Sequence, residues 1–435
     1  MSLTVNVIGA GLAGAECAWQ LAKRGIKVKL FEMKPQKFSP AHSLETFAEL
    51  VCSNSLRAAG LENAPGLLKE EMRAFDSIII KSADLNSVPA GGALAVDREK
   101  FSEYISKTLS QNENIEIISG EVTKIPDDSY TVIATGPLTS DALFGEIAKL
   151  TGCEYLHFFD AAAPVVTFES VDMNNAYKAS RYDKGEACYI NCPMNKEEYE
   201  AFYNELINAE CAQLKEFENT KVFEGCMPVE VMASRGEQTL LFGPLKPVGL
   251  TNPKTGKEPF AVVQLRQDNS EATLYNLVGF QTHLKFGEQK RVFGMIPALK
   301  HAEFVRYGVM HRNTYINSPN LLNNMYQMRN NEKIFFAGQI TGVEGYIESA
   351  ASGLAVGLYL SQIINNGQAK VLPRETAIGA LSHYISDETI VKFQPMNINF
   401  GIIPSLNERI RKKREKNLKL SERALGLVSE YLSDN

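Results

Sequence analysis

The stretch LTVNVIGAGLAGAECAWQLAKRGIKVKLFEMK, residues 3–34, decides the fold class of this chain. Its apolar run at residues 3–8 predicts a buried strand, and the helical recurrence of apolar residues at 12–23 predicts a helix. A second apolar run at 27–31 predicts another strand, which ends at the acid Glu32. Two strands joined through a helix, with an acid at the end of the second strand, are typical of an α/β dinucleotide-binding unit.

The turn between the first strand and the helix has the G-x-G-x-x-G spacing. Gly9 permits a tight turn, Gly11 lets the backbone approach a pyrophosphate, and Gly14 lets the helix pack closely on the sheet. The first turn of the helix would present unpaired N–H groups and the positive end of the helix dipole to phosphate. Glu32 would accept hydrogen bonds from ribose hydroxyls. The residues expected at the dinucleotide are Gly9, Ala10, Gly11, Leu12, Ala13, Gly14 and Glu32.

Composition places the chain among ordinary globular proteins. Its 435 residues are enough for two or three domains. Hydrophobic residues make up 44% and charged residues 22%, which excludes a disordered chain. The net charge of −6 means that a nucleic-acid partner would have to meet a local basic patch.

The seven cysteines show no dense spacing pattern, which favours free thiols in a reducing compartment. Residues 188–192, CYINC, have no second pair at metal-ligand spacing, so we expect no metal. The first residues lack the positively charged start of a secretory leader. No uninterrupted apolar run reaches the roughly 18 residues that span a bilayer. A soluble, cytoplasmic protein without a membrane segment is expected.

A second glycine loop lies far downstream, in KIFFAGQITGVEGYIESAASGLAVGLYL, residues 333–360. The order there is strand, glycine loop and small-residue helix, and Gly338 and Gln339 begin the loop. Residues 96–125 predict a helix followed by a strand, and YTVIATGP, residues 130–137, predicts a further strand. Two distant glycine loops suit a long dinucleotide such as FAD.

The expected fold is α/β, with a discontinuous Rossmann-like FAD-binding domain that is interrupted by an inserted α+β domain. We place the FAD-binding domain at 1–160 and 325–405. The inserted domain is expected at 161–324, and a basic helical segment at 406–435.

The chain resembles a known family over most of its length. The resemblance rests on six segments in order: GAGLAG with Glu32, ELVCSNSLR (49–57), FEGCMPVE (223–230), GFQTHLKFGEQKRVF (279–293), GQITGVEGYIESAASG (338–353) and QPMNINFGIIP (394–404). Together they look like the flavin- and folate-dependent tRNA (uracil-5-)-methyltransferases, which make ribothymidine in the T-loop of bacterial tRNA. Gln339 stands where many flavoproteins of this frame have an aspartate, as in this family and its larger wobble-uridine-modifying relative. The resemblance implies FAD, methylenetetrahydrofolate as carbon donor, and NADPH or NADH as reductant.

Such a reaction needs a thiol and a base. C5 of uracil is a poor nucleophile, and addition of a thiolate to C6 places electron density at C5. A base must then remove the C5 proton before the thiol can leave. By resemblance, Cys226 is the attacking thiol, and Cys52 is the base or guards a carbon unit held on the flavin; the division of roles stays open. Arg57 stands near Cys52, whereas the acids Glu224 and Glu230 around Cys226 would not lower a thiol pKa.

The other cysteines are expected to be packing residues: Cys17, Cys153, Cys188, Cys192 and Cys211. For folate, the resemblance implies an imidazole that covers the pterin. His283 is our choice, with His301 in reserve. The nearby cations Lys285, Lys290, Arg291 and Lys300 suit the acidic folate tail.

Transfer RNA would meet the basic stretch NERIRKKREKNLKLSERAL, residues 407–425. Its cations could neutralise several phosphates, although a solvated helix face is an equal interpretation. They are Arg409, Arg411, Lys412, Lys413, Arg414, Lys416 and Lys419.

Four alternatives remain open. The same chemistry on ribosomal RNA cannot be separated from sequence. A wobble-uridine modifier would be longer and carry an extra helical domain. An NAD(P)H–flavin oxidoreductase would need neither Cys226 nor an RNA surface. A non-enzymatic RNA-binding flavoprotein would leave both motif thiols idle.

Overall fold

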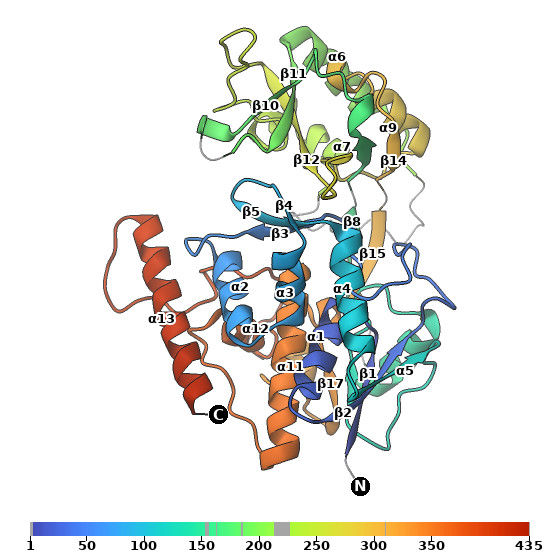
Figure 1. Ribbon diagram of the computed structural model, residues 1–435, viewed down its shortest axis with the longest axis vertical. Helices are drawn as coiled ribbons and strands as arrows, with labels where there is room; N and C mark the ends of the chain where they lie inside the picture. The colour runs from blue at the N-terminus through green and yellow to red at the C-terminus, as the bar shows by residue number, and fades with distance from the viewer. Residues whose placement is uncertain are drawn as a thin grey trace.

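The computed structural model describes residues 3–152, 156–161, 163–183, 186–212, 227–308 and 310–434. Figure 1 shows a lower part, which holds both termini, and an upper part built around a second sheet. The α/β class expected from the sequence is confirmed by this arrangement.

The lower part is built on a six-stranded sheet in the order β16-β17-β7-β1-β2-β6. All of its pairings are parallel except that of β16 with β17. One row of side chains crosses the sheet at Leu30, Val7, Val132 and Phe335, and each is fully buried. Continuous apolar strands of this kind are typical of parallel sheets covered on both faces. The strands are β1 (Thr4–Ile8), β2 (Lys27–Glu32), β6 (Ile115–Ser119), β7 (Thr131–Ile133), β16 (Gln327–Met328) and β17 (Asn331–Phe336).

Helices α1 (Leu12–Ala22) and α11 (Tyr346–Asn366) pack against each other at unusually short range. A β-carbon on Gly353 would lie 2.0 Å from the Ala13 carbonyl oxygen, so only glycine permits this approach. Among the described helices, α11 is long and apolar enough to cross a membrane, but 89% of its apolar window is buried inside the protein. It is a core helix whose small residues let it lie against α1.

The upper part contains an antiparallel six-stranded sheet in the order β10-β11-β12-β13-β9-β14. Its helices cover one face and enclose a second hydrophobic core. Its strands are β9 (Val165–Thr167), β10 (Tyr177–Ala179), β11 (Tyr189–Met194), β12 (Ala261–Gln267), β13 (Leu274–Leu277) and β14 (Phe304–Arg306). Its helices include α6 (Lys196–Asn208), α7 (Val229–Ser234), α8 (Thr239–Phe242) and α9 (Phe286–Phe293).

Two small sheets lie where the parts meet (Figure 1). One pairs β8 (Leu156–Ala161) with β15 (Met310–Tyr315), and the other joins β3 (Ser55–Ala58), β5 (Ala93–Val96) and β4 (Ser87–Val88). The remaining helices are α2 (Ala64–Ala74), α3 (Ile78–Leu85), α4 (Arg98–Ser110), α5 (Asp141–Thr151), α10 (Ser318–Leu321), α12 (Ala377–Tyr384) and α13 (Lys413–Ser433).

Candidate functional site

A pocket opens at the carboxyl ends of β1, β2 and β7, with an empty volume of about 1150 Å³ that includes open solvent at its mouth. Ligands of open α/β sheets bind at this edge. The glycine turn forms one wall, and the second glycine loop before α11 forms another. The lining residues include Gly9, Ala10, Gly11, Leu12, Ala13, Glu32, Lys34, His42, Glu49, Val51, Glu121, Gly136, Gly338, Gln339 and Tyr346.

The glycines of the turn have separate physical tasks. Gly9 has a φ of +98°, which favours glycine. A β-carbon on Gly14 would lie 1.8 Å from the Gly9 carbonyl oxygen, so Gly14 serves helix–strand packing and does not line the pocket. A β-carbon on Gly11 would meet no protein atom within 4 Å. Gly11 therefore keeps open the space beside the start of α1.

Glu32 is buried at the end of β2, and backbone donors hold its carboxylate. The Ala10 N–H donates to Oε2 at 2.9 Å, and the Lys34 N–H donates to Oε1 at 3.0 Å. Each carboxylate oxygen has a lone pair left for a ribose hydroxyl. The acid is thus fixed between the glycine turn and the segment after β2.

The second glycine loop closes the pocket from the other side. Gly338 has a φ of +85°, and its N–H donates to Ser352 Oγ in α11 at 2.6 Å. Gln339 Nε2 donates to Glu344 Oε2 at 2.6 Å, which fixes the amide at the pocket wall. A neutral amide in this place adds no negative charge near a pyrophosphate.

The pocket fits a dinucleotide such as FAD on three observations. The first turn of α1 contains no acidic side chain, and its N-cap residue, Gly11, has no side chain that could cap the helix. Its N–H groups are therefore available to phosphate. The empty space beside Gly11 matches a close backbone approach, and Glu32 is placed for a ribose.

The loop that carries Cys52 forms part of the same wall. The N–H groups of Cys52 and Ser53 both donate to the Tyr346 hydroxyl, at 2.7 and 3.2 Å. Tyr346 is the first residue of α11 and lines the pocket, as does Val51. The Cys52 side chain is partly exposed. The loop thus places a thiol-bearing residue next to the dinucleotide pocket.

The upper sheet holds this loop from the other side. Arg266 donates to Asn54 Oδ1 at 3.1 Å and to Ser53 Oγ at 2.8 Å. Asn54 Nδ2 in turn donates to the Gln267 carbonyl at 2.9 Å. Both β12 residues belong to the upper part, so the Cys52 loop is anchored on both parts of the molecule.

Arg57, expected to act on Cys52, pairs with a buried acid. Its guanidinium donates to Glu348 Oε1 at 2.8 Å, and the Glu348 side chain is fully buried in α11. Burial raises the pKa of Glu348, and the charge of Arg57 opposes that rise. Arg57 therefore stabilises a buried carboxylate, and its expected effect on the Cys52 thiol stays a prediction.

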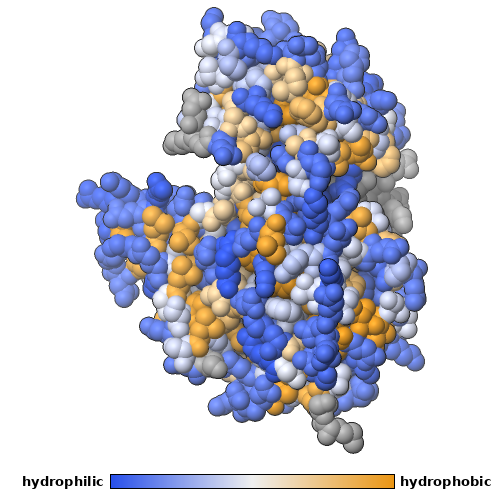
Figure 2. Space-filling view, in the orientation of Figure 1, coloured by the Kyte–Doolittle hydropathy of each residue, from blue (hydrophilic) through white to orange (hydrophobic). Residues whose placement is uncertain are grey.

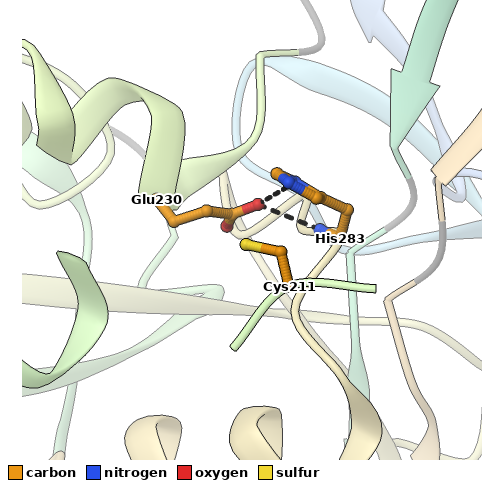
Figure 3. A group of neighbouring side chains, drawn as sticks. All are labelled: Cys211, Glu230 and His283. Carbon is orange, nitrogen blue, oxygen red and sulfur yellow. Dashed lines mark hydrogen bonds and ion pairs between the residues drawn. The ribbon is translucent and has the colours of Figure 1, made fainter. Parts of the chain in front are cut away.

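A second cluster of chemically active side chains lies in the upper part (Figure 3). Cys211, Glu230 and His283 bring a sulfur, a carboxylate oxygen and a ring nitrogen within 4.8 Å of one another. His283 Nδ1 lies in ion-pair contact with Glu230 Oε1, and the backbone N–H of His283 donates to the same oxygen at 3.0 Å. Burial alone would lower the pKa of His283, but Cys211 and Glu230 together raise it to about 10.

Comparisons with known proteins find similar sequences over most or all of the chain. The family model for glucose inhibited division protein A matches residues 4–368. A methylenetetrahydrofolate–tRNA-(uracil-5-)-methyltransferase TrmFO of Acetivibrio thermocellus is 65% identical over 99% of this chain and 98% of its own length. The proteins of the same name from Ligilactobacillus salivarius and Listeria monocytogenes serotype 4b are 61% and 62% identical, and each alignment covers 100% of both chains.

This chain belongs to the TrmFO/Gid family. Two crystal forms of Aquifex aeolicus GidA superpose with TM-scores of 0.67 and 0.69, at 15% and 16% identity. Both cover 98% of this chain, and 74% and 76% of the GidA chain. At that identity, the likeness shows the fold alone.

The TrmFO/Gid site residues expected from sequence fall into three groups. One group lies together around one pocket: the glycine-turn residues except Gly14, together with Glu32, Gly338 and Gln339. Gly14 is instead a packing residue. Cys52 borders that pocket. Cys226 and Glu224 lie outside the described residues, as does Cys153. The assignment of FAD contacts and thiol roles stays a prediction.

Sequence reasoning did not single out several polar residues of the TrmFO/Gid pocket. Lys34 lies in ion-pair range of Glu49, 3.9 Å from Oε2, and both side chains are buried. His42 Nδ1 lies 2.6 Å from Ser39 Oγ, and burial lowers the pKa of His42. The available signal was the position of Lys34 two residues after Glu32, because the chain that leaves β2 runs along the pocket.

The expectations for the other cysteines and for the cations near His283 have different outcomes. Cys17 and Cys192 are fully buried, as packing residues should be, whereas Cys211 is partly exposed and belongs to the His283 cluster. Lys285 pairs with Glu210 at 2.5 Å, and Arg291 pairs with Glu205 and Glu288. Two of the four cations suggested for the folate tail thus already have acidic partners at the surface.

The basic C-terminal stretch is exposed. Hydrophilic side chains cover the end of α13 that projects from the lower part (Figure 2). Arg411, Lys412, Lys413, Arg414 and Lys416 are all exposed there. Lys419 is different, because it pairs with Glu408 at 2.8 Å.

Proposed function

We propose that this chain transfers a one-carbon unit from methylenetetrahydrofolate to C5 of the T-loop uridine of tRNA and completes it as a methyl group. One observation carries the proposal: relatives named for this reaction match the chain from end to end at 61–65% identity. The pocket supports it, because a thiol-bearing loop and a dinucleotide cradle share one wall.

In the proposed reaction, the Cys226 thiolate adds to C6 of the uracil and forms a carbon–sulfur bond. The electron pair moves to C5, which bonds to the methylene carbon as one bond from that carbon to its carrier nitrogen breaks. Cys52 accepts the C5 proton as the remaining carbon–nitrogen bond breaks and an exocyclic methylene forms. Hydride is then added to that methylene, and the electron pair that restores the C5–C6 double bond expels the Cys226 sulfur. Cys52 is suited to this task because its backbone is fixed against Tyr346 at the pocket wall.

FAD, when bound, supplies the hydride that completes the methyl group, with electrons from NADPH or NADH. The α1 N–H groups and Gly11 would hold its pyrophosphate, Glu32 its ribose, and the Gly338–Gln339 loop would cover it. We place the pterin of the folate at His283. The target uridine must leave its stack to reach such a site.

We further propose that the exposed cations of α13 bind tRNA phosphates, and that the protein acts in the cytoplasm, where tRNA is available. The proposed division into domains remains 1–160 with 325–405, 161–324, and 406–435. The described strands of the parallel sheet and of the antiparallel sheet are consistent with that division.

The decisive experiment combines the reduced protein, undermodified tRNA and labelled methylenetetrahydrofolate. Label is expected at C5 of the T-loop uridine. Label in ribosomal RNA alone would favour the sister activity, and flavin turnover without RNA labelling would favour a plain oxidoreductase.

The nucleophile is tested with Cys226→Ala. We expect normal FAD absorbance and no covalent adduct with 5-fluorouridine-containing tRNA, because no sulfur remains to add to C6. Cys188→Ala is the matched control, since Cys188 lies outside the six family segments. An adduct that survives in Cys226→Ala would assign the attack to another residue.

A further inference from the structure

Glu230 is a buried carboxylate to which the reaction described above gives no task. Its side chain is 6% exposed, and it lies in the first turn of α7. Both carboxylate oxygens are occupied by one neighbouring segment. Thr282 Oγ1 donates to Oε2 at 2.7 Å, and the backbone N–H of His283 donates to Oε1 at 3.0 Å.

The third contact is with the imidazole itself. His283 Nδ1 lies against Glu230 Oε1, and Figure 3 shows the ring directed to that carboxylate. The contact is an ion pair and not a hydrogen bond, and the facing carboxylate favours the ring form with hydrogen on both nitrogens, because that form carries the opposite charge. The ring is 11% exposed, so water cannot readily substitute for the acid. Glu230 thus fixes both the backbone and the ring of His283.

We propose that Glu230 is a positioning residue that holds His283 in one orientation and as an imidazolium. The ligand of this cation rests on the proposed function, which places the pterin of the folate at His283. A flat cation can cover a ring and also attract an acidic ligand. A neutral ring could only do the first.

The surrounding charges favour this role. Among the described residues, the titratable groups that face His283 are Glu230 from α7 and Cys211 from the segment after α6, and both stabilise the cationic ring. The nearby cations Lys285 and Arg291 pair with acids of their own at the surface. His283 is therefore a cation whose partner is buried and whose charge does not depend on exposed ion pairs.

Zinc is the rival occupant of this cluster. A thiolate, a carboxylate and an imidazole are all zinc ligands. A metal at His283 Nδ1 would require that nitrogen to lose its hydrogen and would replace the direct contact with Glu230. The two arrangements therefore differ in the protonation of one ring, which can be measured.

The first test is an NMR titration with ¹³C-labelled histidine between pH 5 and 9. The chain has six histidines, so His283→Gln identifies the signal by its loss. We expect wild-type His283 to remain cationic through pH 8. In Glu230→Gln, the midpoint of the His283 titration should fall by roughly three pH units, because burial then acts with less opposition. Thr282→Val is the matched control, because it removes a hydrogen bond to the same carboxylate and leaves the charge.

The second test is the pH dependence of methylation. Relative to wild type at each pH, Glu230→Gln should lose roughly tenfold in kcat/KM for methylenetetrahydrofolate at pH 8, and recover most of it near pH 6, where the ring regains its proton. Glu230→Asp, which keeps the charge, should recover part of the activity at both pH values. An equal loss at pH 6 and 8 would overturn the proposal, because a merely structural defect does not follow ring protonation.

Two further results would overturn the proposal. One is a wild-type His283 that titrates near its ordinary value of about 6.5. The other is stoichiometric zinc binding that requires Cys211, Glu230 and His283. Absence of tRNA methylation by the wild-type protein would instead contradict the proposed function, and the titration would still decide the role of Glu230.

Discussion

Single residues set the shape of the dinucleotide pocket, and two glycines of the same turn do so in different ways. Gly11 and Gly14 belong to one motif, but a β-carbon would meet nothing at the first and a carbonyl oxygen at the second. The motif therefore combines a residue that leaves room for the ligand with a residue that leaves room for the protein.

This distinction predicts opposite behaviour for two alanine variants. Gly14→Ala should lower the free energy of unfolding of the apoprotein by about 1–3 kcal/mol, because α1 must move away from the Gly9 carbonyl. Gly11→Ala should change that energy by less than about 1 kcal/mol. It should nevertheless weaken FAD binding roughly tenfold or more, which corresponds to about 1.4 kcal/mol. Urea unfolding and flavin fluorescence titration measure the two quantities, and equal stability losses would contradict this interpretation.

The sequence was sufficient for the residues whose task is local. The turn, Glu32 and the Gly338 loop could be predicted because each follows a strand within a short motif. The His283 cluster could not be assembled in this way. Cys211, Glu230 and His283 are far apart in the chain, and only the packing of three separate segments brings them together.

At the scale of elements, α1 and α11 depend on the absence of side chains where they touch. Gly353→Ala would place its β-carbon 2.0 Å from the Ala13 carbonyl oxygen. We expect a loss of about 2–3 kcal/mol in the free energy of unfolding, measured by urea denaturation.

Gly426→Ala is the matched control, because this glycine is also helical, in α13, but is exposed and has no atom within 4 Å of an added β-carbon. Gly426→Ala should raise the free energy of unfolding by up to about 1 kcal/mol, because alanine has the higher helix propensity. Similar losses in both variants would show that close packing between α1 and α11 is not the cause.

Helices α2 and α12 are joined by a buried acid with a consequence for pH. Glu71 accepts hydrogen bonds from the Ala377 and Ile378 N–H groups, at 2.6 and 2.9 Å. Burial nevertheless raises the pKa of Glu71 to about 8, and the two hydrogen bonds only partly oppose that rise. The folded state therefore binds this proton more tightly than the unfolded chain.

The stability that this proton contributes is fully present below the unfolded pKa, near 4.5, and is lost as the pH rises through about 8. Between these values the slope approaches about 1.4 kcal/mol per pH unit. Glu71→Gln should flatten this dependence in chemical denaturation at several pH values. Glu70→Gln removes a charge from a partly exposed neighbour and is the control. Wild-type stability that increases from pH 5 to 8 would contradict the prediction.

At the scale of the whole molecule, an acidic protein must bind an acidic polymer, and α13 offers a local solution. Replacement of Lys412, Lys413 and Lys416 by glutamine should weaken tRNA binding. The plot of log affinity against log salt should become shallower by roughly 0.7–0.9 for each phosphate that the variant no longer neutralises. Filter binding from low to moderate salt measures this slope. The same replacement at Lys81, Lys107 and Lys196, which are exposed outside α13, controls for net charge and should leave the slope nearly unchanged.

The global architecture was only partly accessible from sequence. The parallel sheet follows from strand and helix periodicity, because each unit is local. The antiparallel sheet of the upper part has short strands such as β10 and β14, and their pairing depends on long-range packing that no periodicity encodes. The anchoring of the Cys52 loop by Arg266 likewise joins segments that are far apart in the chain, and no local motif predicts it.

That double anchoring ties the position of the Cys52 thiol to the present arrangement of the two parts. If the upper sheet rotated away from the lower one, the loop could keep its bonds to Tyr346 or to Arg266, but not to both. Separation of the two parts would thus break the pocket wall that carries Cys52. The cradle for the dinucleotide and the thiol beside it exist in their present form only while the two sheets hold this loop between them.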